Sequence, residues 1–109
     1  MERKTTIQID DTVYQAEPAT IESTFLGVED HGIFVAYLSF AGNGWGQSES
    51  PRVRYGAELE KYITSVLTTL GVDSWEEVAG KEVLVLRESY GGLIKGFAHH
   101  RENRYSLFD

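Results

Sequence analysis

The chain has 109 residues, of which 41% are hydrophobic, so it is long enough to form one domain with its own core and too apolar to be a disordered segment. It has no cysteine, which excludes disulfides, thiol chemistry and cysteine metal sites. We expect a single domain over residues 1–109, located in the cytoplasm, without a signal peptide or membrane span. The formal net charge of -7 disfavours direct binding of nucleic acids.

The charge is unevenly distributed along the chain. From Thr5 to Pro51 there is no lysine or arginine, and outside this stretch ten acidic residues balance ten basic ones. The seven acidic residues of the stretch are Asp10, Asp11, Glu17, Glu22, Glu29, Asp30 and Glu49. Such a field attracts a basic partner or a cation, although a solvated acidic surface that keeps a protein soluble is the commoner origin of this pattern.

The first half of the chain is predicted to consist of β-strands. Residues 5–9 and 12–16 form a small hairpin around Asp10-Asp11, and the dipeptide Glu17-Pro18 is expected to end the second strand. Residues 20–28 and 33–41 form a longer hairpin, in which Gly27 indicates a bulge or a close backbone approach. Gly32 suits a left-handed position in the connecting turn.

The second long strand is apolar on both faces. One face carries Phe34, Ala36, Leu38 and Phe40, and the other carries Ile33, Val35, Tyr37 and Ser39. This pattern predicts either a central strand that is covered on both sides or an interface between copies of the chain.

The second half is predicted to contain one helix followed by strands. Apolar residues at steps of three and four predict a helix over residues 56–70, ended by Gly71, and Ser74 with Glu77 predicts a further helical turn. Residues 83–86 and 93–99 are strand-like, and residues 1–4 and 101–109 are candidates for flexible ends. The fold class is therefore α+β, with a mostly antiparallel sheet of about 4–6 strands and one main helix packed on one face.

The run I-E-S-T-F-L-G-V-E-D-H-G-I at residues 21–33 resembles a family of small, uncharacterised proteins encoded by bacteriophages and prophages. In that family a similar hairpin precedes a glycine-rich loop and a later Trp-acid-acid segment, which corresponds here to Trp75-Glu76-Glu77 before Gly80-Lys81. The loop A-G-N-G-W-G-Q is less glycine-dense than the family pattern, and Trp45 is unusual in it. The resemblance implies a phage or prophage setting and no catalytic residue.

The glycine-rich loop is the first candidate site. Gly42, Gly44 and Gly46 would expose backbone N–H groups to an anion, but neither the phosphate-loop nor the dinucleotide fingerprint is present, and the glycines also suit a wide turn. Trp45 stands between two glycines, so its indole either folds back over the sheet or anchors a partner protein.

The turn with Glu29, Asp30 and His31 is the second candidate, since carboxylates and imidazole bind metals and His99-His100 would add ligands. No metal-binding spacing is present, and a polar turn explains the same residues. The adjacent acids and the serines show no pattern of an acid-base or nucleophilic site, so no catalytic, cofactor or metal residue is assigned.

These observations favour a non-enzymatic accessory protein that binds a host or phage protein with a basic surface. The predicted partner-binding residues are Trp45, Asn43, Gln47, Glu29, Asp30 and His31. One alternative is a small-ligand or metal-binding protein that uses the loop and the His/acid residues. Another is a homo-oligomeric structural phage component that associates through Ile33, Val35 and Tyr37.

Overall fold

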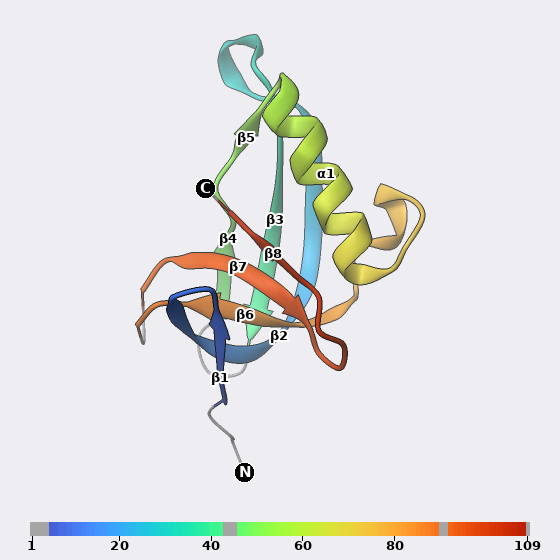
Figure 1. The fold of residues 1–109 in the computed structure, drawn as a ribbon. Helices are drawn as coiled ribbons and strands as arrows, with labels where there is room; N and C mark the ends of the chain where they lie inside the picture. Colours follow the sequence, from blue (N-terminus) through green and yellow to red (C-terminus); the bar gives the residue numbers. More distant parts are fainter. Residues whose placement is uncertain (1–4, 43–45, 90–91, 109) are drawn as a thin grey trace.

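The computed structural model describes residues 5–42, 46–89 and 92–108, without the side chains of Thr5 and Asp30. These residues form an α+β fold with one α-helix and an eight-stranded antiparallel sheet, in the order β4-β3-β2-β6-β7-β8, with β1 beside β2 and β5 beside β3 (Figure 1). The strands are β1 Thr5–Ile9, β2 Thr12–Val28, β3 Phe34–Gly42, β4 Gly46–Glu49, β5 Val53–Arg54, β6 Glu82–Arg87, β7 Ile94–His99 and β8 Tyr105–Leu107. The fold class and the single main helix are confirmed, whereas the prediction of about 4–6 strands was too low because β4, β5 and β8 are too short to show an alternating pattern.

Strand β2 is the element that joins the whole sheet. It pairs with β1 through residues 12–16, with β6 through residues 15–20 and with β3 through residues 19–28. The prediction that Pro18 ends this strand is wrong. Pro18 lies between Ala16, the last β2 residue that pairs with β1, and Ala19, the first β2 residue that pairs with β3. Its nitrogen faces the gap between these two strands, so the missing N–H costs no ladder hydrogen bond.

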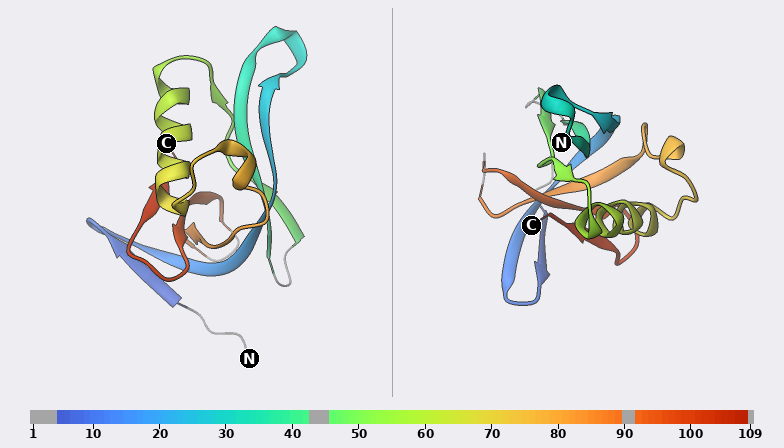
Figure 2. Two further views of the ribbon diagram at one scale, coloured as in Figure 1. Left: turned by 90° about the vertical axis from the view of Figure 1, so that its right-hand side faces the viewer. Right: turned by 90° about the horizontal axis from the view of Figure 1, so that it is seen from above.

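Strand β2 bends along its length, so that the β2–β3 hairpin rises away from the β1–β2 hairpin (Figure 2). A β-bulge at Glu22 interrupts the register with β3 between Ile21 and Ser23, and bulges bend and twist the strand that carries them. Of the two interpretations of Gly27, a bulge or a close backbone approach, the bulge is wrong, because Gly27 pairs regularly with Val35 and the ring of Phe25 lies over it. The turn is the 3-10 segment η1, Asp30–Gly32, in which both His31 and Gly32 have left-handed backbones.

The helix α1, Ala57–Leu70, lies across one face of the sheet (Figure 1). Its end follows from Gly71, which has φ 72° and donates its N–H to the Leu67 carbonyl, while the Val72 N–H bonds to the same oxygen. The apolar face of α1 packs on a core that includes Ile21, Ala36, Leu38, Phe40, Val66, Val83, Val85 and Phe97. A smaller cluster, formed by Ile9, Tyr14, Ala16, Leu86 and Ala98, involves the β1–β2 hairpin.

Two short segments after α1, residues 74–77 and 105–108, are held by specific contacts. The 3-10 turn η2, Trp75–Glu77, matches the predicted helical turn, and the Ser74 hydroxyl donates to the Glu77 carboxylate at 3.0 Å. The C-terminal residues, considered as a flexible tail, instead form β8 against β7, and Phe108 packs against Phe40, Tyr62 and Phe97. No helix within the described residues is long and apolar enough to cross a membrane.

Candidate functional site

The end of the β2–β3 hairpin extends beyond the first turn of α1 (Figures 1 and 2). Apolar residues alternate along β2 and β3 up to the turn, as they do in the core. Leu26 pairs with Ala36 and Val28 pairs with Phe34, so Leu26, Val28 and Phe34 lie on the face of the sheet that carries the core residue Ala36. Since α1 begins only at Ala57, it covers Ala36 but leaves the hairpin end open. Four large apolar side chains are therefore between 36% and 80% exposed there, namely Leu26, Val28, Phe34 and Tyr55, and together they are called the apolar patch.

Tyr55 belongs to this patch through the backbone. Its N–H donates to the Phe34 carbonyl at 2.9 Å, which continues the β3–β5 pairing by one residue. Tyr55 lies two residues after Val53, which packs against the main core, so Tyr55 and Phe34 occupy the same face of the sheet. An exposed apolar cluster at one protruding end is typical of a surface that contacts another molecule.

The opposite face of the hairpin is covered by aromatic and arginine side chains. The rings of Phe25 and Tyr37 are stacked with their centroids 5.2 Å apart, and the Arg52 guanidinium carbon lies 4.2 Å from the centroid of the Tyr37 ring. Arg52 also donates to Glu29 at 2.7 Å and to Glu49 at 3.2 Å. The hydrogen bond that Arg52 donates to Glu29 raises the pKa of the Arg52 guanidinium, so this side chain stays charged.

An open hollow of about 680 Å³ lies beside this face. It is lined by Phe25, Val28, Glu29, His31, Ile33, Val35, Arg52 and Arg54, so Val28, at the end of β2, borders both the apolar patch and this hollow. Its walls combine apolar side chains with both signs of charge, a composition that suits a side chain of a partner protein. Of the three residues predicted for an oligomer interface, Val35 is buried, whereas Ile33 and Tyr37 are partly exposed.

The predicted site residues do not gather in one place. Glu29 and His31 line the hollow at the turn, whereas Gln47 lies in β4, opposite Ala41, and donates a hydrogen bond to Glu22. The two groups stand near opposite ends of β3, whose eight residue steps span roughly 26 Å. Asn43, Trp45 and the side chain of Asp30 lie outside the described residues.

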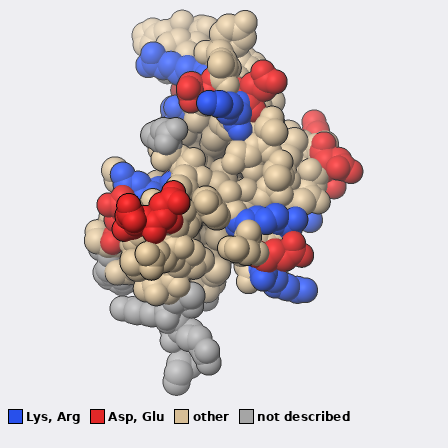
Figure 3. All heavy atoms as spheres, in the orientation of Figure 1, with Lys and Arg blue, Asp and Glu red and all other residues tan. Residues whose placement is uncertain are grey.

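The charge separation seen in the sequence is not maintained in space at the hairpin. Arg52 and Arg54 follow the acidic stretch directly, but β5 pairs with β3 and brings both arginines to the hairpin that carries Glu29. Figure 3 shows basic and acidic side chains side by side in the upper part of the molecule. A uniformly acidic hairpin is therefore absent from the described surface.

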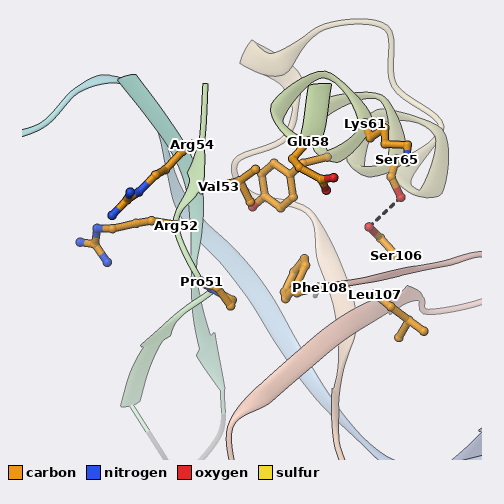
Figure 4. Close-up of a pocket in the computed structure, with 11 residues that line it drawn as sticks. Pro51, Arg52, Val53, Arg54, Glu58, Lys61, Ser65, Ser106, Leu107 and Phe108 are labelled. Atoms are coloured by element: carbon orange, nitrogen blue, oxygen red, sulfur yellow. Dashed lines mark hydrogen bonds between the residues drawn. The ribbon is translucent and has the colours of Figure 1, made fainter. Parts of the chain in front are cut away.

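A second hollow, of about 410 Å³, lies between β5, α1 and β8 (Figure 4). Phe108 forms part of its wall, Ser65 and Ser106 share a hydrogen bond at 2.8 Å across it, and Arg52 and Arg54 point away from α1. The Tyr62 hydroxyl, which also lines it, shares a hydrogen bond with the Ser50 hydroxyl, and burial raises the pKa of this phenol to about 12. Tyr62 is therefore protonated at neutral pH and serves the packing of the core.

The histidines at the end of β7 interact with the chain itself. The rings of His99 and His100 are stacked with centroids 4.9 Å apart, and His99 Nδ1 accepts the backbone N–H groups of Arg101 and Glu102. Partial burial, followed by the nearby Arg104, lowers the pKa of His99. No cluster of three or more His, Asp or Glu residues suited to a metal ion occurs among the described residues.

No family model, curated protein or solved structure matches this chain. The resemblance of residues 21–33 to a bacteriophage family therefore stays a prediction.

Sequence reasoning missed the apolar patch and Arg52. Leu26, Val28 and Phe34 have the same alternation as core residues, and only the position of α1 shows that they are exposed. Arg52 is separated from Glu29 by 23 residues, so their ion pair has no local signal. The one available hint was the uninterrupted apolar alternation up to the turn itself.

Proposed function

We propose that this chain is a phage- or prophage-encoded accessory protein that binds a protein of the phage or of its bacterial host through the end of the β2–β3 hairpin. The apolar patch of Leu26, Val28, Phe34 and Tyr55 carries this proposal. Exposed apolar side chains of this size are typical of protein-binding surfaces. The bacterial cytoplasm and the phage setting rest on the sequence alone.

The charge of the chain as a whole supports a protein partner over a nucleic acid. The chain has a net charge of -7, which repels phosphate backbones and attracts basic surfaces. Arg52 already neutralises Glu29, so the attraction for a basic partner arises from acidic residues beyond the turn. Exposed acids of this kind occur in the segment between α1 and β6, at Asp73, Glu76 and Glu77.

A matched pair of charge substitutions tests this proposal. Val28 and Val13 are exposed to a similar extent, 62% and 53%, but Val28 lies in the patch and Val13 lies in the β1–β2 hairpin. We expect Val28→Lys to weaken binding of a partner by at least about tenfold, because a lysine in the patch loses apolar contact and repels a basic surface. Val13→Lys is expected to leave the affinity unchanged.

The partner is first captured from a bacterial lysate with the wild-type chain, identified by mass spectrometry, purified and titrated against each variant. Circular dichroism of each variant establishes that it is folded. Equal affinities for wild type and Val28→Lys, or equal losses for both lysine variants, would contradict a binding surface at the hairpin end.

A further inference from the structure

The edge of β2 opposite β3 is open over residues 23–28. Strand β6 pairs with β2 only as far as Thr20, and the next residue, Ile21, bonds through its N–H to the Lys81 carbonyl and through its carbonyl to the Gly80 N–H. Beyond Ile21, no strand of the described residues pairs with this edge. It is therefore a sheet edge of about 17–20 Å, long enough for a six-residue strand.

The backbone groups that point outward can be assigned from the ladder. The Glu29 N–H donates to the Ile33 carbonyl, so Glu29 faces β3, and residues of a strand alternate in direction. The N–H and C=O groups of Thr24, Leu26 and Val28 consequently point to the open edge. The residues of β3 that lie opposite support this assignment. Leu38 is opposite Thr24 and Phe34 is opposite Val28, and their carbonyls accept hydrogen bonds from Ser50 and Tyr55, on the side of β3 away from β2.

After the β-bulge at Glu22, the edge lacks the charges and prolines that usually protect a sheet edge. Residues 23–28, with the sequence S-T-F-L-G-V, contain no charge and no proline. The side chains of Leu26 and Val28 stand beside the edge on the exposed face, so a strand placed there would extend the apolar patch. Main-chain pairing together with an adjacent apolar row is the arrangement found when an extended segment adds to a sheet.

The charge near one end of the edge indicates which strand would fit. Segment 72–80 carries the exposed acids Asp73, Glu76 and Glu77 and is followed by one exposed base, Lys81. It is joined to β2 where the Gly80 N–H donates to the Ile21 carbonyl and the Ile21 N–H donates to the Lys81 carbonyl. Figure 3 shows acidic side chains on the side of the molecule where this segment lies in Figure 1. A second copy of the chain would bring the same excess of negative charge, whereas a strand with lysine or arginine at one end would be attracted.

We infer that the edge of β2 at residues 23–28 binds an extended segment of a partner protein as an additional strand, with apolar residues beside Leu26 and Val28 and basic residues toward segment 72–80. This inference rests on the proposed function and specifies how the partner is held. The hydrogen bonds of Thr24, Leu26 and Val28 supply the main-chain recognition. The apolar patch and the acidic segment supply the selectivity.

The probe is a capped ten-residue peptide of alternating valine and threonine, with two lysines at its amino end or, in a second peptide, at its carboxyl end. The decisive pair of variants is Leu26→Pro and Leu26→Ala. Proline removes the outward N–H of residue 26 but no bond to β3, because Phe25 and Gly27 supply those bonds. Alanine keeps the N–H and removes most of the apolar side chain.

We expect wild type to bind one of the two lysine peptides, Leu26→Pro to bind it at least about tenfold more weakly, and Leu26→Ala to lose only about threefold. On wild type, the bound peptide should slow hydrogen exchange of the Thr24, Leu26 and Val28 amides, which tests the inference even if Leu26→Pro does not fold. Replacing the two lysines by glutamates should abolish binding.

Three results would overturn this inference. The first is that neither lysine peptide binds. The second is that Leu26→Pro binds the peptide as tightly as wild type and the peptide leaves the exchange of the wild-type Thr24, Leu26 and Val28 amides unchanged, and the third is that wild type is a dimer in light scattering and Leu26→Pro abolishes the dimer. The purified partner separates the two proposals. If Val28→Lys loses the partner but Leu26→Pro keeps it, the hairpin end is a binding site without strand addition. If both variants keep the partner, the proposed function fails as well.

Discussion

Replacing Phe40 by alanine is expected to lower the free energy of unfolding by about 3–5 kcal/mol. The Phe40 ring is fully buried, and its centroid lies 6.0 Å from that of Phe97 and 6.5 Å from that of Phe108. The cavity left by its removal would be enclosed by the sheet and by α1, which leaves little freedom for neighbouring side chains to fill it.

Urea unfolding followed by circular dichroism measures this effect, with Phe25→Ala as the matched control. Phe25 is a phenylalanine of the adjacent strand, but it is partly exposed and stacks on Tyr37 outside the core. Its replacement should cost less than half as much as that of Phe40. Equal losses for the two variants would mean that the core does not lie where the structure places it.

Replacing Gly96 by alanine is expected to detach β8 from β7 and to cost about 2–4 kcal/mol. A Cβ atom on Gly96 would lie 2.3 Å from the backbone oxygen of Ser106 and 2.9 Å from the Leu107 Cα. Because both contacts are with backbone atoms, no side-chain movement relieves them. Strand β8 would have to shift, and Phe108 with it.

Thermal unfolding and amide exchange of Phe108, whose N–H donates to the Lys95 carbonyl at 2.7 Å, measure the detachment. Gly27→Ala is the control, since a Cβ there meets only the Phe25 ring at 3.4 Å, an ordinary contact. A Gly96→Ala variant as stable as Gly27→Ala, with Phe108 still protected, would be incompatible with the observed packing of β8.

The parts of the fold that depend on local signals were predictable. The helix α1 follows from its apolar spacing, and its end follows from Gly71, which is the residue best suited to a left-handed backbone. The η2 turn follows from Ser74 and Glu77. In each case the deciding interactions connect residues within five positions of one another, so the sequence pattern contains them.

The parts that depend on distant residues were not predictable. Pro18 is compatible with a continuous strand only because its nitrogen faces the gap between β1 and β3. Strand β8 has three residues and no pattern of its own, and its place depends on the missing side chain of Gly96. Both features depend on how distant strands pair in the sheet, so the sequence of each segment alone does not show them.

The candidate site was predictable only in part. The turn residues Glu29 and His31 do line a hollow, but the sequence placed them with Gln47, which lies near the other end of β3. The apolar patch has the alternation of a core strand, so its exposure depends on where α1 begins. The open edge of β2 depends on β6 pairing no further than Thr20.

Amide hydrogen exchange along residues 23–28 of the free chain tests whether the hairpin end offers an open sheet edge. An open edge should give an alternating pattern, with slow exchange at Phe25 and Gly27, whose N–H groups face β3, and fast exchange at Thr24, Leu26 and Val28. Slow exchange at all five amides in a chain that is monomeric by light scattering would contradict it, because the edge would then already be covered.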